Sequence, residues 1–299
     1  MSRKKDIAII NVPMWYGRGK QGVEHAPALL STALSATDWK AAIQTIVNID
    51  IPEVDMTDRS TMHARQLECI VKANEQLAQV VTEQLHAGRF VLTIGGDHSI
   101  GLGSVSGAIQ YDNNIGLIWF DAHGDMNTER TSPTGHIHGM PVAALMGYCQ
   151  SALNDVPTVR VPHQNIFWIG ARDLDEGEQE LAKKLNLHIY SSESIHQKGM
   201  TAVMEEVRTE MAERGIQRLH LSFDVDAFDP TLFPATGVRV PDGLLMDDFE
   251  QFVHSLSSLP TLTSMDFVEY NPLMDDAAQT CRQLSIAFIE KILWTAQNE

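Results

Sequence analysis

The stretch IWFDAHGDMN, residues 118–127, begins as an apolar strand and ends among acids. Asp121, His123 and Asp125 stand at every second position of it. In an extended chain alternate side chains lie on one face, so these three could converge on one point. The apolar half predicts a buried central strand, and the polar half predicts a functional site directly after it.

Seven other segments share this strand-like character, and helical patterns lie between them. Several strands are continuous apolar runs, as expected when both faces of a sheet are covered. Alternating strands and helices predict a parallel sheet of about eight strands with helices on both faces, in one domain spanning residues 1–299. The predicted strands are 6–13, 41–50, 90–96, 115–123, 165–172, 188–191, 219–226 and 263–271, and the clearest helices are 66–85, 175–186, 201–215 and 280–294.

Composition and charge narrow the possible partners. The 299 residues are 43% apolar and carry a net charge of −17, which disfavours nucleic acid and anionic membranes as partners. The charge suits a cationic substrate or metal ions, although solubility alone would also explain it. The chain has no apolar run of 18 residues, and its basic start leads into a short strand rather than a signal peptide, so we expect a cytoplasmic protein. Its odd set of cysteines, without CxxC spacing, is predicted to be reduced and non-catalytic: Cys69, Cys149 and Cys281.

Two more strand ends carry the same chemistry. His98 follows Gly95-Gly96, and Asp224 and Asp226 end the segment LHLSFDVD, whereas Asp229 before a proline resembles a turn residue. Together with the opening stretch they make a pool of two imidazoles and four carboxylates. Any one acid could be a helix cap or a turn residue, but three strand ends together predict a metal site. Two divalent ions would balance four carboxylates, and a mixed oxygen and nitrogen ligand set without thiolates suits Mn²⁺.

These motifs resemble those of the arginase-like ureohydrolases, in the same order along most of the chain. The matching segments are GGDHS (95–99), DAHGDMNT (121–128), TGHIHGMP (134–141), SFDVDAFDP (222–230) and VEYNP (268–272). The resemblance implies a three-layer α/β/α sandwich around an eight-stranded parallel sheet. It also implies two Mn²⁺ per chain, one held by His98, Asp121, Asp125 and Asp224 and the other by Asp121, His123, Asp224 and Asp226.

The same resemblance implies a reaction. A hydroxide bridging two metals would attack the guanidinium carbon of L-arginine and yield L-ornithine and urea. Asp125 would hold that hydroxide and pass its proton to the leaving amine, and Glu269 would bind the guanidinium. His138 would shuttle protons, although it could also be a loop histidine with a purely structural role.

Two segments resemble those that read the amino-acid end of the substrate in arginases. Asp175 and Glu178, in the segment RDLDEGE, would meet the α-ammonium, although acids also favour a helix N-terminus. The segment NTERTSPTGHIHG supplies neutral partners for the α-carboxylate, which are Asn127, Ser132, Thr134 and His136.

Three departures from the arginase pattern bear on substrate identity. His136 replaces the usual Asn, Val238 and Arg239 alter the segment GVRVPDGLL, and Ala26 stands where Gly is common. The alternatives are therefore an agmatinase, a formimidoylglutamase, a related single-zinc deacetylase, or a non-catalytic arginine-binding homologue. The resemblance also implies a homo-oligomer, a trimer or a hexamer.

Overall fold

The computed structural model describes residues 5–55 and 63–298, so Arg3 and Lys4 of the basic start lie outside it. Its centre is one sheet of eight strands in the order β2-β1-β3-β8-β7-β4-β5-β6, and every neighbouring pair is parallel. The strands are β1 (Ile7–Val12), β2 (Ile43–Asn48), β3 (Phe90–Gly95), β4 (Gly116–Phe120), β5 (Ile166–Gly170), β6 (His188–Ser191), β7 (Arg218–Asp224) and β8 (Thr261–Val268).

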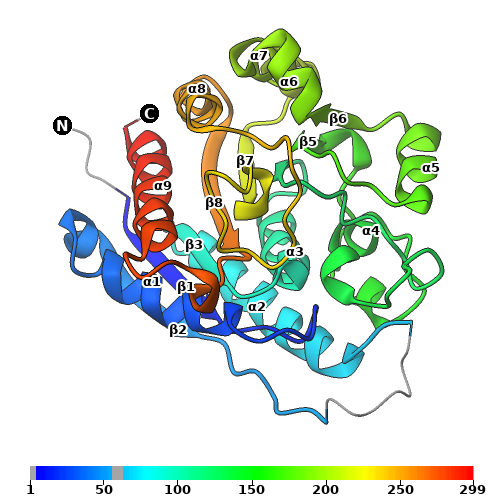
Figure 1. Cartoon of the computed structure of the whole chain (residues 1–299), viewed down its shortest axis with the longest axis horizontal. Helices are drawn as coiled ribbons and strands as arrows, with labels where there is room; N and C mark the ends of the chain where they lie inside the picture. Colours follow the sequence, from blue (N-terminus) through cyan, green and yellow to red (C-terminus); the bar gives the residue numbers. More distant parts are fainter. Residues whose placement is uncertain (1–4, 56–62, 299) are drawn as a thin grey trace.

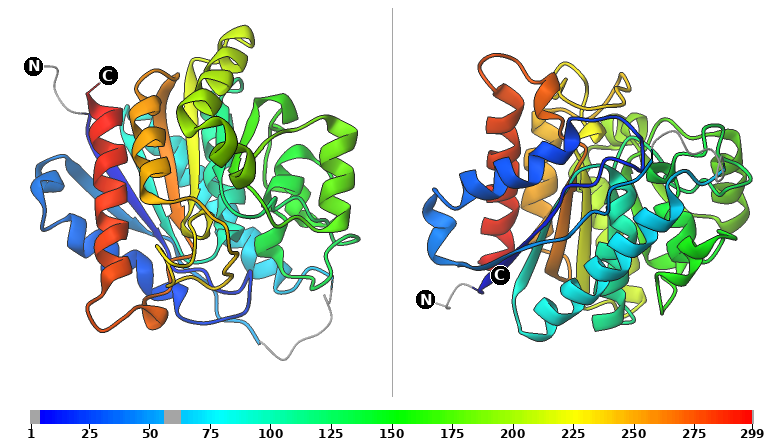
Figure 2. Two further views of the ribbon diagram at one scale, coloured as in Figure 1. Left: turned by 45° about the horizontal axis from the view of Figure 1, so that its top comes forward. Right: turned by 90° about the horizontal axis from the view of Figure 1, so that it is seen from below.

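Helices cover both faces of the sheet, as Figures 1 and 2 show. One apolar layer packs the sheet against α1 (Ala26–Leu34), α6 (Ser192–Lys198), α7 (Met200–Glu213), α8 (Met246–Leu256) and α9 (Thr280–Gln297). The opposite layer involves α2 (Leu67–His86), α3 (Gly101–Tyr111), α4 (Pro141–Met146) and α5 (Glu176–Leu185). The predicted three-layer α/β/α sandwich around an eight-stranded parallel sheet is confirmed.

The strand order brings four loops to one place. In the sheet, β8 and β7 lie between β3 and β4, although they come later in the chain. Because parallel strands end at the same edge, the residues that follow β3, β4, β7 and β8 become neighbours. This edge is where the predicted site residues lie.

A glycine makes the first of these loops possible. A Cβ at Gly96 would lie 1.7 Å from the carbonyl oxygen of Met14, so no larger residue fits where the chain leaves β3. The chain then turns into the short helix η3 (His98–Ile100), which presents His98 at the sheet edge.

The opening stretch reaches its arrangement by a different route from the one predicted. β4 ends at Phe120, so Asp121, His123 and Asp125 follow the strand instead of extending it. Asp125 also has a φ of 51°, in the left-handed region. The convergence of these side chains therefore depends on an irregular segment after the strand, with a bend at residues 121–122 and a left-handed backbone at Asp125, rather than on alternation along an extended strand.

None of the helices in the described ranges combines the length and the apolar character that crossing a bilayer requires. The three cysteines are free and buried, with Cys69 on the inner face of α2.

Candidate metal centre and adjoining pocket

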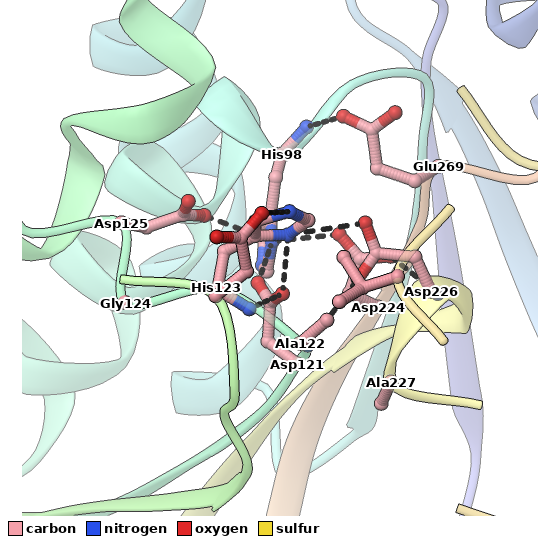
Figure 3. A network of polar contacts seen from close by, with 12 residues as sticks. His98, Asp121, Ala122, His123, Gly124, Asp125, Asp224, Asp226, Ala227 and Glu269 are labelled. Carbon is pink, nitrogen blue, oxygen red and sulfur yellow. Dashed lines mark hydrogen bonds and ion pairs between the residues drawn. The ribbon is translucent and has the colours of Figure 1, made fainter. Parts of the chain in front are cut away.

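The six predicted metal ligands come together at the carboxyl edge of the sheet (Figure 3). The Nδ1 atom of His98 lies 2.9 Å from Asp121 Oδ2, 3.1 Å from Asp125 Oδ2 and 3.1 Å from Asp224 Oδ2. One imidazole nitrogen can donate at most one hydrogen, so three acids cannot all bond to it. Their convergence therefore marks a position that suits a cation.

A second group of ligands lies beside the first and shares one acid with it. His123 Nδ1 is 3.2 Å from Asp121 Oδ1 and 3.2 Å from Asp226 Oδ2. Its partners Asp121 and Asp226 are almost completely buried. Asp121 thus turns one carboxylate oxygen toward each group, which is the arrangement expected of an acid that bridges two ions.

Two buried atoms at this centre lack a hydrogen bond of ordinary geometry. His98 Nδ1 and Asp125 Oδ2 lie 3.1 Å apart as an ion pair, but neither makes a hydrogen bond to any of the described residues. Buried polar atoms are seldom left without a partner, because the loss of hydration is costly. Together with the donor set of imidazoles and carboxylates, this shows that the residues present fit divalent metal ions.

The electrostatics of the cluster point the same way. Burial, with the charge of Asp121, raises the pKa of Asp125 to about 6. Burial and the neighbouring charges of Asp226 and Asp121 raise the pKa of Asp224. Although burial opposes its charged form, the carboxylates around His98 hold its pKa well above the ordinary value. Crowded acids and protonated imidazoles would exchange their protons for a bound cation.

A support network behind His98 was missed by the sequence reasoning. The His98 ring stacks on Trp119 at 4.1 Å, and Trp119 Nε1 donates to Asp121 Oδ2 at 3.0 Å. His98 Nε2 lies 2.8 Å from Ser222 Oγ, which donates to Asp266 Oδ1 at 2.6 Å. Polar residues at alternate positions in LHLSFD (219–224) and SMDF (264–267) were the available signal.

Glu269 and His138 form a pair above the cluster. Glu269 follows β8 with a φ of 65°, and its Oε1 accepts from the His98 amide at 2.9 Å. His138 Nδ1 lies 3.7 Å from the same oxygen. Burial opposes ionisation of Glu269, but His138 holds the pKa of this carboxyl below its ordinary value. A positive φ is uncommon for residues other than glycine, although aspartate adopts it more readily than most, and such positions often cluster at functional sites.

A cavity of about 280 Å³ adjoins the cluster, and two chemically different segments line it. One is acidic and includes Asp173, which sequence reasoning did not single out, with Asp175 and Glu178. The other is the segment 132–139, which carries no acidic side chain, and Asn127 also lines the cavity. All six predicted substrate contacts line this cavity: Asn127, Ser132, Thr134, His136, Asp175 and Glu178.

The acids at the start of α5 serve the local structure as well. Glu178 is buried, and its two carboxylate oxygens accept from the amides of Met126 and Asp175, each at 2.8 Å. Asp175 Oδ2 accepts from Asn127 Nδ2 at 2.7 Å. Asp175 and Glu178 therefore stabilise the start of α5, as acids at a helix N-terminus do. They also line the cavity.

Comparison with known proteins agrees with this geometry. The model of the arginase family matches residues 5–294. The chain belongs to the arginase family.

Curated and solved members of the family match along nearly their whole length. The arginase of Brevibacillus brevis is 36% identical, over 97% of this chain and 99% of its own. The native structure of Bacillus caldovelox arginase has a TM-score of 0.90 at 34% identity, covering 97% of this chain and 98% of its own. Entamoeba histolytica arginase, solved in complex with L-ornithine, has a TM-score of 0.88 at 30% identity, covering 97% and 99%.

Within this arginase-family chain, Arg172 links the segment after β7, which carries the candidate ligand Asp226, to residues 240–241. Its guanidinium donates to the carbonyl of Asp226 at 3.0 Å and, among other carbonyls, to that of Val240 at 2.8 Å. Gly243 is required here, because a Cβ would lie 2.4 Å from the backbone nitrogen of Asp229 and 2.6 Å from an Arg172 nitrogen. Arg172 is the first residue of the segment RDLDEGE, but nothing local in the sequence indicates this contact.

The departures from the arginase pattern fall at different distances from the pocket. Val238 and His136 line it, whereas Arg239 is exposed. Ala26 is buried at the start of α1. Of these departures, only Val238 and His136 are among the described residues that line the cavity.

Proposed function

We propose that this arginase-family hydrolase binds two Mn²⁺ and converts L-arginine to L-ornithine and urea. The observation that carries the proposal is that the ligand cluster adjoins a cavity lined by both acidic and neutral residues, with His123 and Asp125 of the cluster among the lining. An α-amino acid has one cationic and one anionic group at its far end, and these two kinds of lining residue are complementary to them. The family relatives named as arginases support the same reaction.

The proposed ligands divide between the two ions. His98, Asp121, Asp125 and Asp224 would hold one, and Asp121, His123, Asp224 and Asp226 the other, with Asp121 and Asp224 bridging. Two such ions would supply Lewis acidity and an activated water near neutral pH.

The chain's own residues would carry out the proton transfers. Asp125 would orient the attacking water and accept its proton. As the bond from the guanidinium carbon to the ornithine nitrogen breaks, Asp125 would deliver that proton to the leaving amine. His138, paired with Glu269, would exchange protons between this nitrogen and solvent.

Glu269 would orient the substrate. Its carboxylate is almost completely buried and lies beside His98, whose amide it accepts from, and a planar guanidinium could pair with it there. Asp175 and Glu178 would meet the α-ammonium, and Asn127, Ser132, Thr134 and His136 the α-carboxylate. Binding both ends of the substrate would hold its reactive carbon beside the activated water.

The test is a comparison of substrates on the purified chain loaded with Mn²⁺. Ornithine release from L-arginine should exceed urea release from agmatine and formamide release from formiminoglutamate. Faster turnover of either rival would overturn the substrate assignment. Arginine binding without turnover would identify a non-catalytic homologue instead.

Two further measurements complete the proposal. Elemental analysis should find two manganese ions per chain, and a single zinc would favour the deacetylase alternative. We also propose a homo-oligomer, a trimer or a hexamer, which light scattering during gel filtration would measure.

A further inference from the structure

His136 lines the cavity and also contacts a cation, Arg65, that lies outside it. Its ring lines the pocket, and its Nε2 is 3.2 Å from Nη1 of Arg65. Arg65 is held in place by its backbone, because its amide donates to the Gly135 carbonyl at 2.9 Å. Arg65 itself is not among the residues that line the cavity.

This contact decides which ring nitrogen of His136 carries hydrogen. A guanidinium has only donors, so Nε2 must accept from Arg65. A neutral imidazole that accepts at Nε2 carries its hydrogen on Nδ1. Burial, with the charges of His138, Arg65 and Arg18, lowers the pKa of His136 to about 4, so the ring is neutral at physiological pH. Within the described residues Nδ1 has no hydrogen-bond partner, which leaves its N–H free for a ligand.

We propose that Arg65 is a positioning residue that fixes His136 as an N–H donor to the substrate's α-carboxylate. Without Arg65 the ring could turn an Nδ1 lone pair toward that carboxylate, and the two would repel. The pair therefore selects guanidino substrates that carry a carboxylate over those that lack one, such as agmatine. This inference rests on the proposed function, because it concerns the same pocket.

Among residues 5–55 and 63–298, Arg65 has His136 as its only side-chain hydrogen-bond partner. Its Nε is buried without a hydrogen-bond partner, and the loop contact to Gly135 is made by the backbone. That backbone contact would survive a change of side chain.

The decisive experiment measures whether the effect of Arg65 depends on His136. In the Mn²⁺-loaded chain, Arg65→Met should raise the KM for L-arginine about tenfold, with kcat within about twofold and the KM for agmatine unchanged. Arg65→Lys keeps one donor to Nε2 and should recover part of the loss. In a His136→Asn background, Arg65→Met should change the KM for arginine less than about twofold, because an amide offers its N–H without help.

A matched variant separates positioning from the loss of positive charge. Arg130→Met removes an exposed cation from the loop that carries His136, six positions before it. This change should not alter the preference for arginine over agmatine. The proposal is overturned if Arg65→Met weakens arginine and agmatine equally, or if its effect is the same with Asn at position 136. Manganese content and circular dichroism report whether each variant is folded, and Arg65→Lys decides the question if Arg65→Met does not fold.

Failure of the proposed function would be visible separately. If the wild-type chain does not hydrolyse arginine, calorimetric titration with L-arginine and with agmatine measures the same carboxylate preference without turnover. A preference that Arg65→Met removes would uphold the inference while the arginase reaction fails. If the chain hydrolyses arginine but Arg65→Met leaves the preference for arginine over agmatine unchanged, the arginase reaction is upheld and the inference fails.

Discussion

The two faces of the central strands β7 and β8 are equally buried and chemically opposite. On one face Leu221 and Phe223 of β7 lie beside Met265 and Phe267 of β8 in the apolar layer under α8 and α9. On the other face the corresponding neighbours are His220 and Ser222 of β7 and Ser264 and Asp266 of β8. All eight side chains are at most 1% exposed.

The polar face is a connected set of hydrogen bonds. Asp266 accepts from Ser222 at 2.6 Å and from Ser104 at 2.5 Å, and it lies 3.1 Å from His220 Nε2. His220 Nδ1 is 2.8 Å from Ser264 Oγ. Ser222 also contacts His98, so the network ends at a proposed metal ligand.

The apolar face works by packing alone. Phe223 stacks on Phe120 at 4.6 Å and on Phe267 at 5.5 Å. Dispersion and burial are nondirectional, so this face makes the strands rigid without fixing any particular atom. Hydrogen bonds are directional, and the difference indicates that the polar face orients the ligands while the apolar face supplies stability.

The largest effect should come from the ligand cluster above both faces. Asp125→Asn removes the proposed proton acceptor, and turnover of arginine should fall about a thousandfold. The circular dichroism spectrum should not change, because Asp125 lies outside the strands. Near-normal turnover in this variant would refute the role given to Asp125.

The next largest effect should come from the polar face. Asp266→Asn removes one charged acceptor from three buried donors. We therefore expect the free energy of unfolding to fall by about 3 kcal/mol. Misplacement of His98 should also weaken Mn²⁺ binding about tenfold, as measured by calorimetry. Unchanged metal affinity would mean that the network serves stability alone.

Glu178 sharpens the comparison, because it is a buried carboxylate bonded by backbone amides. Burial raises its pKa from 4.5 to about 7, whereas the hydrogen bond from His220 outweighs burial and lowers the pKa of Asp266. A raised carboxyl pKa means that the folded state binds more protons, so stability should fall as pH rises from about 4.5 to about 7, by about 3 kcal/mol. Denaturant titrations of wild type and Glu178→Gln across this range should differ by that amount. Equal slopes with pH would contradict it.

The smallest effect should come from the apolar face. Phe223→Leu changes shape in a packed layer and should cost about 1 kcal/mol of unfolding free energy. Its Mn²⁺ affinity should stay within about twofold of wild type. A large loss of metal binding here would erase the distinction between the two faces.

Local patterns in the sequence were sufficient to predict the strands of the sheet and the edge at which the candidate site residues lie. The apolar runs predicted the strands, and the residues just after them, such as His98 and Asp224, predicted a metal site at the sheet edge. This succeeds because strand propensity and burial are short-range properties, and because all parallel strands place their carboxyl ends at one edge.

Contacts between distant segments were decided by the tertiary structure. The insertion of β7 and β8 between β3 and β4 joins Ser222 and Asp266 to His98, and the pocket loop meets Arg65 from a separate segment. Even the backbone after Phe120, with a bend at residues 121–122 and a positive φ at Asp125, departs from the alternation that the opening stretch suggested. A residue pattern specifies its own backbone, whereas the partner of a side chain depends on which strands become neighbours, and that is a property of the whole fold.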